Sequence, residues 1–306
     1  MDLKKLKAAY PKLEITDNAP MAEHCSFKAG GYAEALVEAG TVAELKGVLR
    51  FVTKEKIDHV ILGNGTNTLF ADGVYHGVVI KQKDDSGDFG SVRINEDGRV
   101  EAGAAVLLSS LSRMVVSEPW SFSGMEGLSG IPGSVGGAVF MNAGAYNYEM
   151  KDVLVSAHGV SPDGEDEKDF SLEEISPGYR HSAFMENGYI ITSAVLKLKP
   201  DDRDEIKARM ADFTERRVTK QPLKYPSAGS SFKRPEGHFA GKLIEDSGLK
   251  GLTVGGAQVS QLHAGFIINV GGATATDILD LMSLVQNTVY DKFEVRLEPE
   301  VRIIKS

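Results

Sequence analysis

From Gly124 to Gly144 the chain reads Gly-Met-Glu-Gly-Leu-Ser-Gly-Ile-Pro-Gly-Ser-Val-Gly-Gly-Ala-Val-Phe-Met-Asn-Ala-Gly. It holds seven glycines in 21 residues, no lysine or arginine, and one carboxylate, Glu126. Glycine lets the backbone approach a ligand closely and present successive N–H groups to an anion. The interleaved apolar residues are not typical of a flexible linker. The stretch therefore predicts a loop that cradles the pyrophosphate of a large, partly apolar cofactor, with a purely structural loop as the alternative.

A second glycine turn follows the short apolar strand expected at residues 59–62. Its residues are Gly63, Asn64, Gly65, Thr66 and Asn67. Turns at the ends of strands are where α/β folds bind phosphates. The turn is not the dinucleotide fingerprint, because a threonine occupies position 68, where the third glycine would stand. Alone it is compatible with a phosphate loop or a simple tight turn; together, the two glycine loops favour a cofactor site.

Composition limits the classes of partner. At 306 residues the chain is long enough for two or three domains, and its 42% hydrophobic and 25% charged residues are ordinary for a globular protein. A net charge of −9 argues against nucleic acid or an anionic membrane as partner. The seven histidines show no metal-ligand spacing, so no metal is expected.

The cysteine content and the N-terminus indicate the compartment. Cys25 is the single cysteine, which excludes an internal disulfide and favours a reducing compartment. We interpret it as a small buried side chain, with a nucleophile as the alternative. Residues 1–7 are basic but precede no apolar segment, and no stretch has the length of a membrane span. We therefore expect a cytoplasmic protein.

The chain divides into three blocks. Residues 1–81 alternate helix and strand, and Thr41 with Glu44 forms a capping box that opens a helix through about Lys56. Residues 82–200 contain two turns, at 95–98 and 161–164, a helix near 106–117 and a strand at 188–198. A charged, solvated helix is expected over 201–220. The third block, 208–292, has a short helix that ends at Gly248, a strand at 266–270 and a helix from about Thr276. The tail, 294–304, reads as a strand.

Polar side chains in two loops are candidates for chemistry. Arg180 lies in a loop after Pro177 and Gly178, and is either solvated or a bidentate partner of a carboxylate or phosphate. His181 follows it and could support it. Small residues around Gly229 expose a serine hydroxyl, and two cations follow at 233 and 234. Either this is a serine turn or the serine is a proton donor, because no hydrolase elbow surrounds it.

In order along the chain, these motifs resemble the UDP-N-acetylenolpyruvoylglucosamine reductase (MurB) family. The resemblance runs nearly end to end, and it is specific because many motifs occur together. The segments that carry it are 27–31 (Phe-Lys-Ala-Gly-Gly), 62–67 (Leu-Gly-Asn-Gly-Thr-Asn), 127–138, 142–146 (Asn-Ala-Gly-Ala-Tyr), Tyr179-Arg180, Gln221-Pro222, 228–230 (Ala-Gly-Ser), 255–259 and 263–266 (His-Ala-Gly-Phe).

The resemblance implies an α+β fold. The family has an FAD-binding module of the vanillyl-alcohol-oxidase type, made of two α+β subdomains, here residues 1–81 and 82–200. A third α+β domain, here 208–292, binds the substrate, and the strand at 294–306 is expected to return to the first subdomain. FAD is held non-covalently and NADPH is the reductant. The substrate is a nucleotide-sugar, the pathway is peptidoglycan synthesis, and we expect a monomer.

The resemblance also implies site residues. Ser230 would protonate C2 of the enolpyruvyl group, while Arg180 and Glu300 would stabilise the enolate-like intermediate. Without this context Glu300 would read as exposed, and as an acid it could donate a hydrogen bond only if burial raised its pKa. Residues expected to bind the cofactor are Gly63, Asn64, Gly65, Thr66, Asn67, Gly127, Ile131, Pro132, Gly133, Ser134, Gly136, Gly137 and Ala138. Those expected to bind substrate are Tyr179, Lys220, Gly229, Ser231 and Lys233.

Two departures from the family pattern stand out. The spacing after Arg180 leaves little room for the inserted loop with a substrate-clamping tyrosine, so the chain resembles the shorter version of the family. Arg234 stands where many relatives have asparagine. Two other functions stay open: another FAD oxidase of the same superfamily, and a silent nucleotide-sugar sensor, which would have no need of Arg180, Ser230 and Glu300 together.

Overall fold

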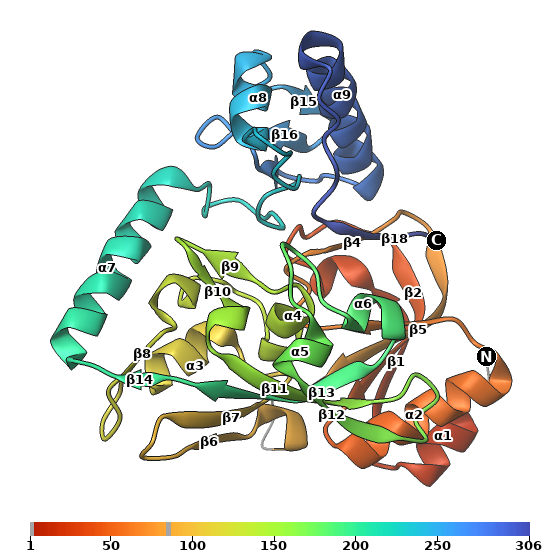
Figure 1. Ribbon diagram of the computed structural model, residues 1–306. Coiled ribbons are helices and arrows are strands. Elements are labelled where there is room, and N and C mark those ends of the chain that lie inside the picture. The colour runs from red at the N-terminus through yellow and green to blue at the C-terminus, as the bar shows by residue number, and fades with distance from the viewer. Residues whose placement is uncertain (1–2, 84–86) are drawn as a thin grey trace. The chain divides into compact units, whose positions relative to one another are not determined.

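The structure, a computed structural model, describes residues 3–83 and 87–306 (Figure 1). The first two residues of the basic N-terminal segment and residues 84–86 of the second block lie outside the described residues. The chain forms two compact units. Unit 1 comprises Met1–Asp17, Ala35–Asn64 and Gly77–Glu215, and unit 2 comprises Asn18–Glu34, Gly65–His76 and Arg216–Ser306.

A four-stranded sheet with the order β1-β2-β5-β3 lies mostly in unit 1. Its strands are β1 (Glu14–Pro20), β2 (Tyr32–Ala39), β3 (His59–Leu62) and β5 (Val74–Gln82). Helix α2 (Val42–Glu55) begins with the predicted capping box between Thr41 and Glu44. The apolar face of α2 packs with Leu6 of α1 (Lys4–Ala9) and with β5 in one core. The strand–helix–strand order expected for the first block is confirmed.

The second sheet of unit 1 is antiparallel, with the order β12-β11-β13-β7-β6. The strands are β6 (Val92–Ile94), β7 (Arg99–Gly103), β11 (Leu154–Val160), β12 (Glu167–Ser171) and β13 (Ile190–Lys197). The predicted turns at 95–98 and 161–164 join β6 to β7 and β11 to β12. The further elements are η2 (Asp88–Gly90), α3 (Leu108–Met114), β8 (Phe122–Ser123), η3 (Glu126–Leu128), α4 (Val135–Phe140), β9 (Gly144–Ala145), β10 (Tyr148–Glu149), η4 (Met150–Asp152), α5 (Leu172–Ile175), α6 (Phe184–Asn187) and β14 (Lys199–Pro200).

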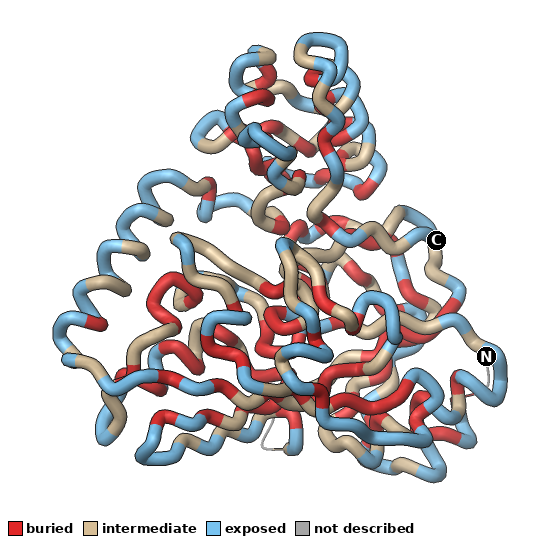
Figure 2. The backbone as a smooth tube through the Cα atoms, viewed as in Figure 1, coloured by how far each residue is buried: buried red, intermediate tan, exposed pale blue. Residues whose placement is uncertain are grey.

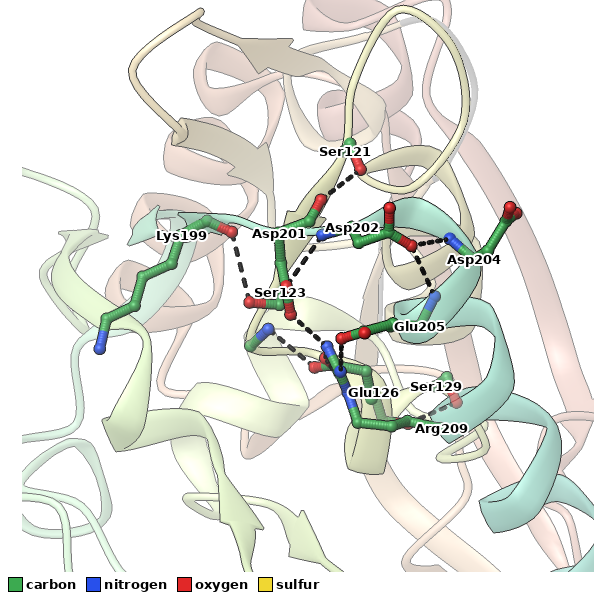
Figure 3. Close-up of polar contacts among 11 residues, drawn as sticks. Ser121, Ser123, Glu126, Ser129, Lys199, Asp201, Asp202, Asp204, Glu205 and Arg209 are labelled. Carbon is green, nitrogen blue, oxygen red and sulfur yellow. Dashed lines mark hydrogen bonds and ion pairs between the residues drawn. The ribbon is translucent and has the colours of Figure 1, made fainter.

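The charged helix expected over 201–220 is α7 (Arg203–Lys220), which is exposed along most of its length (Figure 2). Ile206 is its buried residue. Arg209 forms ion pairs with Glu126 at 2.8 Å and with Asp201 at 2.5 Å (Figure 3). Glu126 is 2% exposed, so the one carboxylate of the glycine-rich stretch is neutralised by the helix. This pairing raises the pKa of Arg209, chiefly through the hydrogen bond to Glu126.

Unit 2 has its own core around helix α9 (Ala275–Phe293). The helix packs against the antiparallel sheet β15 (Thr253–Val254), β16 (Ala257–Val259) and β17 (Ile267–Asn269), and α8 (Ala240–Asp246) contacts it. Two further elements are η1 (Met21–Glu23) and β4 (Thr68–Phe70), and β4 pairs in parallel with β18 (Arg302–Ile304). The short helix that ends near Gly248 and the long last helix are confirmed.

Some predicted elements were too long. The tail is a strand only over Arg302–Ile304, because Glu294 has a left-handed backbone and Pro299 has no N–H for a ladder. The helix near 106–117 is α3, Leu108–Met114, since Leu107 is extended and bridges Ser134. The strand expected at 266–270 is reduced to Ile267–Asn269.

Candidate active site

The two glycine loops of unit 1 meet. Helix α4 begins at Ser134, whose Oγ accepts from Gly137 N at 3.4 Å. The turn after β3 lies against the same loop: Asn64 Nδ2 donates to Pro132 O at 2.7 Å. A Cβ on Gly63 would lie 2.9 Å from Ser134 Oγ. The structure therefore brings Gly63, Asn64, Pro132 and Ser134 together, although they are some 70 residues apart in sequence.

This loop offers backbone N–H donors and has free space beside Gly137. A Cβ on Gly137 would meet only Ser134 Oγ, at an ordinary 3.5 Å, so packing within the protein does not require glycine there. Among the residues that the structure describes, the N–H groups of Gly133 and Ser134 have no protein acceptor. Unpaired N–H groups beside an exposed glycine suit the pyrophosphate of a dinucleotide. These residues fit FAD, whose phosphates need uncharged donors and a close backbone.

Other glycines of the stretch have packing roles. A Cβ on Gly136 would lie 2.8 Å from that of Ala104, and one on Gly127 would lie 2.6 Å from the Tyr148 ring. Ala138 is buried in the same core, and Ile131 packs against it. The assignment of these four residues to the cofactor stays a prediction.

The rest of the predicted phosphate turn belongs to unit 2 and also carries protein contacts. Gly65 has a positive φ and lies so close to His24 that a Cβ would overlap the His24 carbonyl oxygen. Asn67 Nδ2 donates to Glu300 O at 3.1 Å, and Asn67 O accepts from Arg302 N at 3.0 Å. Asn67 therefore fixes the backbone around Glu300. The cofactor role of Gly65, Thr66 and Asn67 stays a prediction.

Arg180 lies in a tight turn of unit 1. Gly178 N donates to His181 O at 3.0 Å, and Arg180 has a left-handed backbone with φ +53°. Its guanidinium donates to Gly144 O at 3.3 Å and lies 5.1 Å from the ring centroid of Tyr179, which is 49% exposed. A non-glycine residue in this region is strained, and such strain is frequent where a side chain must be aimed.

The carboxylate of Glu149, on the hairpin β9–β10, stays ionised. The hydrogen bond from Lys151, assisted by Asn142 and by the charge of Arg180, lowers the pKa of Glu149. His181 forms its own pair with Glu186 at 2.9 Å. The positive charge of Arg180 therefore has an anionic neighbour on the hairpin β9–β10, and His181 is engaged with α6.

In unit 2, Ser230 and Glu300 belong to neighbouring segments. Glu300 N donates to Ser231 O at 2.9 Å, Lys233 N donates to Glu298 O at 2.9 Å, and Phe232 bridges Pro299. Ser231 itself is fully buried, and its Oγ accepts from Ile267 N at 3.0 Å. The short ladder thus places Ser230 next to a residue that is bonded to Glu300. The Ser231 hydroxyl is bound within unit 2, to Ile267 N.

The other predicted substrate residues also lie in unit 2. Gly229 has φ +75° with no atom within 4 Å of a Cβ, so conformation rather than space requires glycine. Lys233 Nζ pairs with Glu298 at 3.3 Å, and Lys220 is the exposed last residue of α7. Their binding of substrate, like that of Tyr179 and Ser231, stays a prediction.

The sequence analysis assigned no role to two side chains of the site. Asn142 is 1% exposed and contacts the Arg180 turn, and Ser182, which follows that turn, is fully buried. The available signal for Asn142 was its position just after a glycine-rich helix. Asparagine is one of the few residues that adopt a left-handed backbone readily, as it does here with φ +40°.

Cys25 is buried, and burial raises the pKa of its thiol to about 12, so it stays protonated. The interpretation as a small buried side chain is confirmed. In the described part of the chain, no group of three or more potential metal ligands occurs, and no helix is long and apolar enough to cross a membrane.

Comparisons with known proteins match two family models to this chain. Residues 33–168 match the family model described as FAD binding domain, and residues 221–304 match UDP-N-acetylenolpyruvoylglucosamine reductase, C-terminal domain. The reductase of that name from Alkaliphilus oremlandii is 48% identical over 301 residues, covering 98% of this chain and 97% of the relative. The chain belongs to the UDP-N-acetylenolpyruvoylglucosamine reductase family. The Clostridioides difficile reductase is also 48% identical, over 96% of this chain and 94% of its own.

A solved structure supports the same assignment. The MurB reductase from Thermus caldophilus superimposes with a TM-score of 0.80 at 37% identity, covering 95% of this chain and 98% of that chain. The family resemblance, the α+β fold, and the expectation of an FAD-containing, NADPH-dependent reductase are therefore confirmed. The oxidase and sensor alternatives are set aside. After Arg180 the chain continues directly into α6 and β13, as expected for the shorter version of the family.

Proposed function

We propose that this chain reduces the enolpyruvyl group of UDP-N-acetylenolpyruvoylglucosamine to a lactyl ether, with Arg180, Ser230 and Glu300 as its catalytic residues. The observation that carries the proposal is the ladder of residues 231–233 with 298–300 in unit 2, in which Ser231, the residue after Ser230, accepts from Glu300 N. Arg180 belongs to unit 1.

When bound, FAD supplies a hydride to C3 of the enolpyruvyl group after reduction by NADPH. Attack at C3 drives negative charge toward C2 and into the carboxylate of the substrate. Arg180 would bind this carboxylate with its planar guanidinium, which stabilises charge that grows in the transition state. Its fixed turn keeps the guanidinium aimed, so little reorganisation is needed at the moment of reaction.

Glu300 would act on the same developing charge. A protonated carboxyl group can donate a hydrogen bond to a carboxylate oxygen, whereas an ionised one would repel it. Its backbone is held on both sides: Glu300 N donates to Ser231 O, and Glu300 O accepts from Asn67. These two bonds support a fixed direction for the side chain.

Ser230 would deliver the proton to C2. A serine hydroxyl is a weak acid, so it must be held against the developing carbanion, with a cation or a water chain behind it. Lys220 and Lys233 are the cations of the same unit that we propose for this purpose. Gly229, with its positive φ, sets the backbone just before the serine.

We propose that the cofactor phosphates lie at the junction of Gly63, Asn64, Pro132, Gly133, Ser134 and Gly137. The support is the meeting of the two loops, the open space beside Gly137 and the unpaired N–H groups of Gly133 and Ser134. A loop of this kind binds an anion without a basic side chain.

We also propose that the protein is a cytoplasmic monomer. The buried, protonated Cys25 fits a reducing compartment, and the acidic composition argues against attachment to an anionic membrane. Light scattering on the purified protein tests the monomer directly: a dimer mass over the working concentration range contradicts it.

The experiment that tests the proposed function separates the two half-reactions. Purified holoprotein is first reduced by NADPH, then mixed with the enolpyruvyl nucleotide-sugar in a stopped-flow instrument without oxygen. Reoxidation of the flavin with formation of the lactyl product supports the proposal. A reduced flavin that oxygen reoxidises and the nucleotide-sugar does not would overturn it.

A further inference from the structure

Both the oxygen and the nitrogen of the Asn142 side-chain amide form hydrogen bonds inside unit 1. The residue lies two positions after the last residue of α4, is 1% exposed, and has φ +40°. Its Oδ1 accepts from Lys151 N at 3.0 Å. Its Nδ2 donates to Gly178 O at 2.9 Å and to Glu149 Oε2 at 3.3 Å. One buried amide therefore joins the hairpin β9–β10 to the turn that carries Arg180.

The hydrogen bond from Asn142 is accepted by Gly178, the first residue of that turn. Gly178 and His181 bridge each other, so the Gly178 carbonyl defines where the turn begins. Arg180 stands inside it with a strained backbone, and its guanidinium returns to Gly144 O on the same hairpin. The hairpin β9–β10 and Asn142 therefore hold both the backbone and the side chain of Arg180.

A second tether acts in parallel. Ser182 Oγ donates to Phe140 O at 2.7 Å, and Phe140 is the last residue of α4. The first turn of this helix follows Ser134 in the loop proposed for the cofactor phosphates. Helix α4 therefore connects that loop at one end with the Arg180 turn at the other.

We propose that Asn142 is a positioning residue, which sets the Arg180 turn relative to α4 through its bond to Gly178. The inference rests on the proposed role of Arg180 in catalysis. A displacement of about 1 Å in a catalytic group can cost on the order of 10²-fold in rate, so loss of this single bond has a measurable effect.

Two substitutions distinguish the effect of the side-chain hydrogen bonds from the effect of the strained backbone. Asn142→Asp is nearly isosteric and keeps the acceptor for Lys151 N, but it loses both donors and places a charge beside Glu149. Asn142→Gly keeps the left-handed backbone without strain and removes the side-chain bonds together with the volume of the buried side chain. If the aspartate variant does not fold, the glycine variant carries the same expectation. Asn187→Asp is the matched control, because Asn187 Oδ1 accepts from Tyr189 N and the residue is the last of α6.

We expect either Asn142 variant to slow reoxidation of the reduced holoenzyme by the enolpyruvyl substrate by about 10²-fold. Reduction by NADPH and the Kd of FAD should stay within about two-fold of the parent. Independently of activity, hydrogen–deuterium exchange should increase at residues 178–182 and not in the Asn187→Asp protein. Unchanged exchange at this turn together with an unchanged rate overturns the inference.

A double-variant cycle with Arg180→Ala separates this inference from the proposed function. If Asn142 acts through Arg180, the double variant is no slower than Arg180→Ala alone. If Arg180→Ala slows the step and the Asn142 effect adds to it in full, the positioning role fails while the catalytic role of Arg180 stands. If Arg180→Ala alone leaves the step unchanged, the proposed function fails and the inference falls with it.

Discussion

The backbone N–H of Glu300 donates to the carbonyl of Ser231 at 2.9 Å, which ties the segment after α9 to the serine loop. The residues of the serine loop precede Glu300 by some 70 positions. Since Ser231 N in turn donates to Gly265 O, the serine loop is held from both sides. Two groups proposed to act on adjacent atoms of one substrate are thus built into a single backbone framework.

Arg180 and Glu300 are expected to act on the charge that grows during hydride addition. Arg180→Ala or Glu300→Ala should slow reoxidation of the reduced flavin by substrate by about 10² to 10³-fold, the usual loss for a group that stabilises developing charge. Reduction by NADPH should change little. Arg99→Ala, at an exposed arginine of β7 paired with Glu101, is the control. Equal losses in both half-reactions would indicate a structural role instead.

Gly137 is expected to leave room for the cofactor. Gly137→Val should purify largely without FAD, because its side chain would enter the space beside Ser134, whereas the apo fold meets only an ordinary contact there. A valine at Gly133 has the same expected result. Flavin absorbance and a fluorescence titration measure occupancy and Kd, and circular dichroism of the apoprotein checks the fold. Full occupancy with parental affinity would remove these positions from the cofactor site.

The Glu126–Arg209 pair is expected to stabilise unit 1. Arg209→Ala leaves the Glu126 carboxylate buried without its cation, and breaking a buried pair costs about 3 kcal/mol at the lower end. The lower end applies because the Arg209 side chain is 34% exposed. Urea unfolding measures the loss. Arg203→Ala is the control, since its partner Glu118 is 84% exposed. Equal losses in the two variants would contradict the special role of the buried carboxylate.

His263 is expected to make the protein sensitive to acid. Burial lowers its pKa below the usual 6.5, and its Nδ1 accepts from Gly265 N. The unfolded chain then binds the proton more tightly, so stability is complete above about pH 6.5 and falls as the pH drops through the folded pKa. The slope is at most about 1.4 kcal/mol per pH unit for one proton.

Urea unfolding between pH 7.5 and 5.5 measures this effect. His263→Gln should flatten the pH dependence, although His59, whose pKa burial also lowers, keeps part of it. His76→Gln is the control, because that side chain is 80% exposed. A parental slope in the His263→Gln protein would show that the histidine does not contribute.

The sequence predicted the parts of the fold that depend on local pattern. The capping box of α2, the turn between β6 and β7 and the amphipathic α9 follow from periodicity and turn chemistry, and the structure has them. The tail was misjudged because Glu294 and Pro299 interrupt a run of strand-forming residues. The first break is the end of α9 itself, and the second depends on the pairing of Pro299 with Phe232, which is distant in sequence.

The sequence identified which segments form the site, but it did not reveal what each residue in them does. Glycine density identified the loop at 124–144, yet Gly127 and Gly136 are explained by contacts with Tyr148 and Ala104 that no local pattern reveals. Likewise Ser230 and Ser231 look alike in sequence, but only the structure shows that the Ser231 hydroxyl is bound to Ile267 N. Asn142, quoted only as part of a motif, was given no role for the same reason.

Ser230 as the proton donor is the central claim. General acid catalysis contributes about 10² to 10⁴-fold, so Ser230→Ala should lower turnover by at least about 10²-fold while FAD binding survives. Ser231→Ala is not a neutral control, since it would leave the buried Ile267 N–H unpaired. Ser283→Ala serves instead, because that hydroxyl is exposed and donates to Leu279 O within α9.

The direct measurement mixes reduced, FAD-loaded Ser230→Ala protein with the enolpyruvyl nucleotide-sugar. A stopped-flow trace follows the flavin, and quenched samples of the same reaction quantify the product. The account predicts that lactyl product forms at least about 10²-fold more slowly than in the parent and in Ser283→Ala. Product release at the parental rate would contradict it and remove the serine from the mechanism.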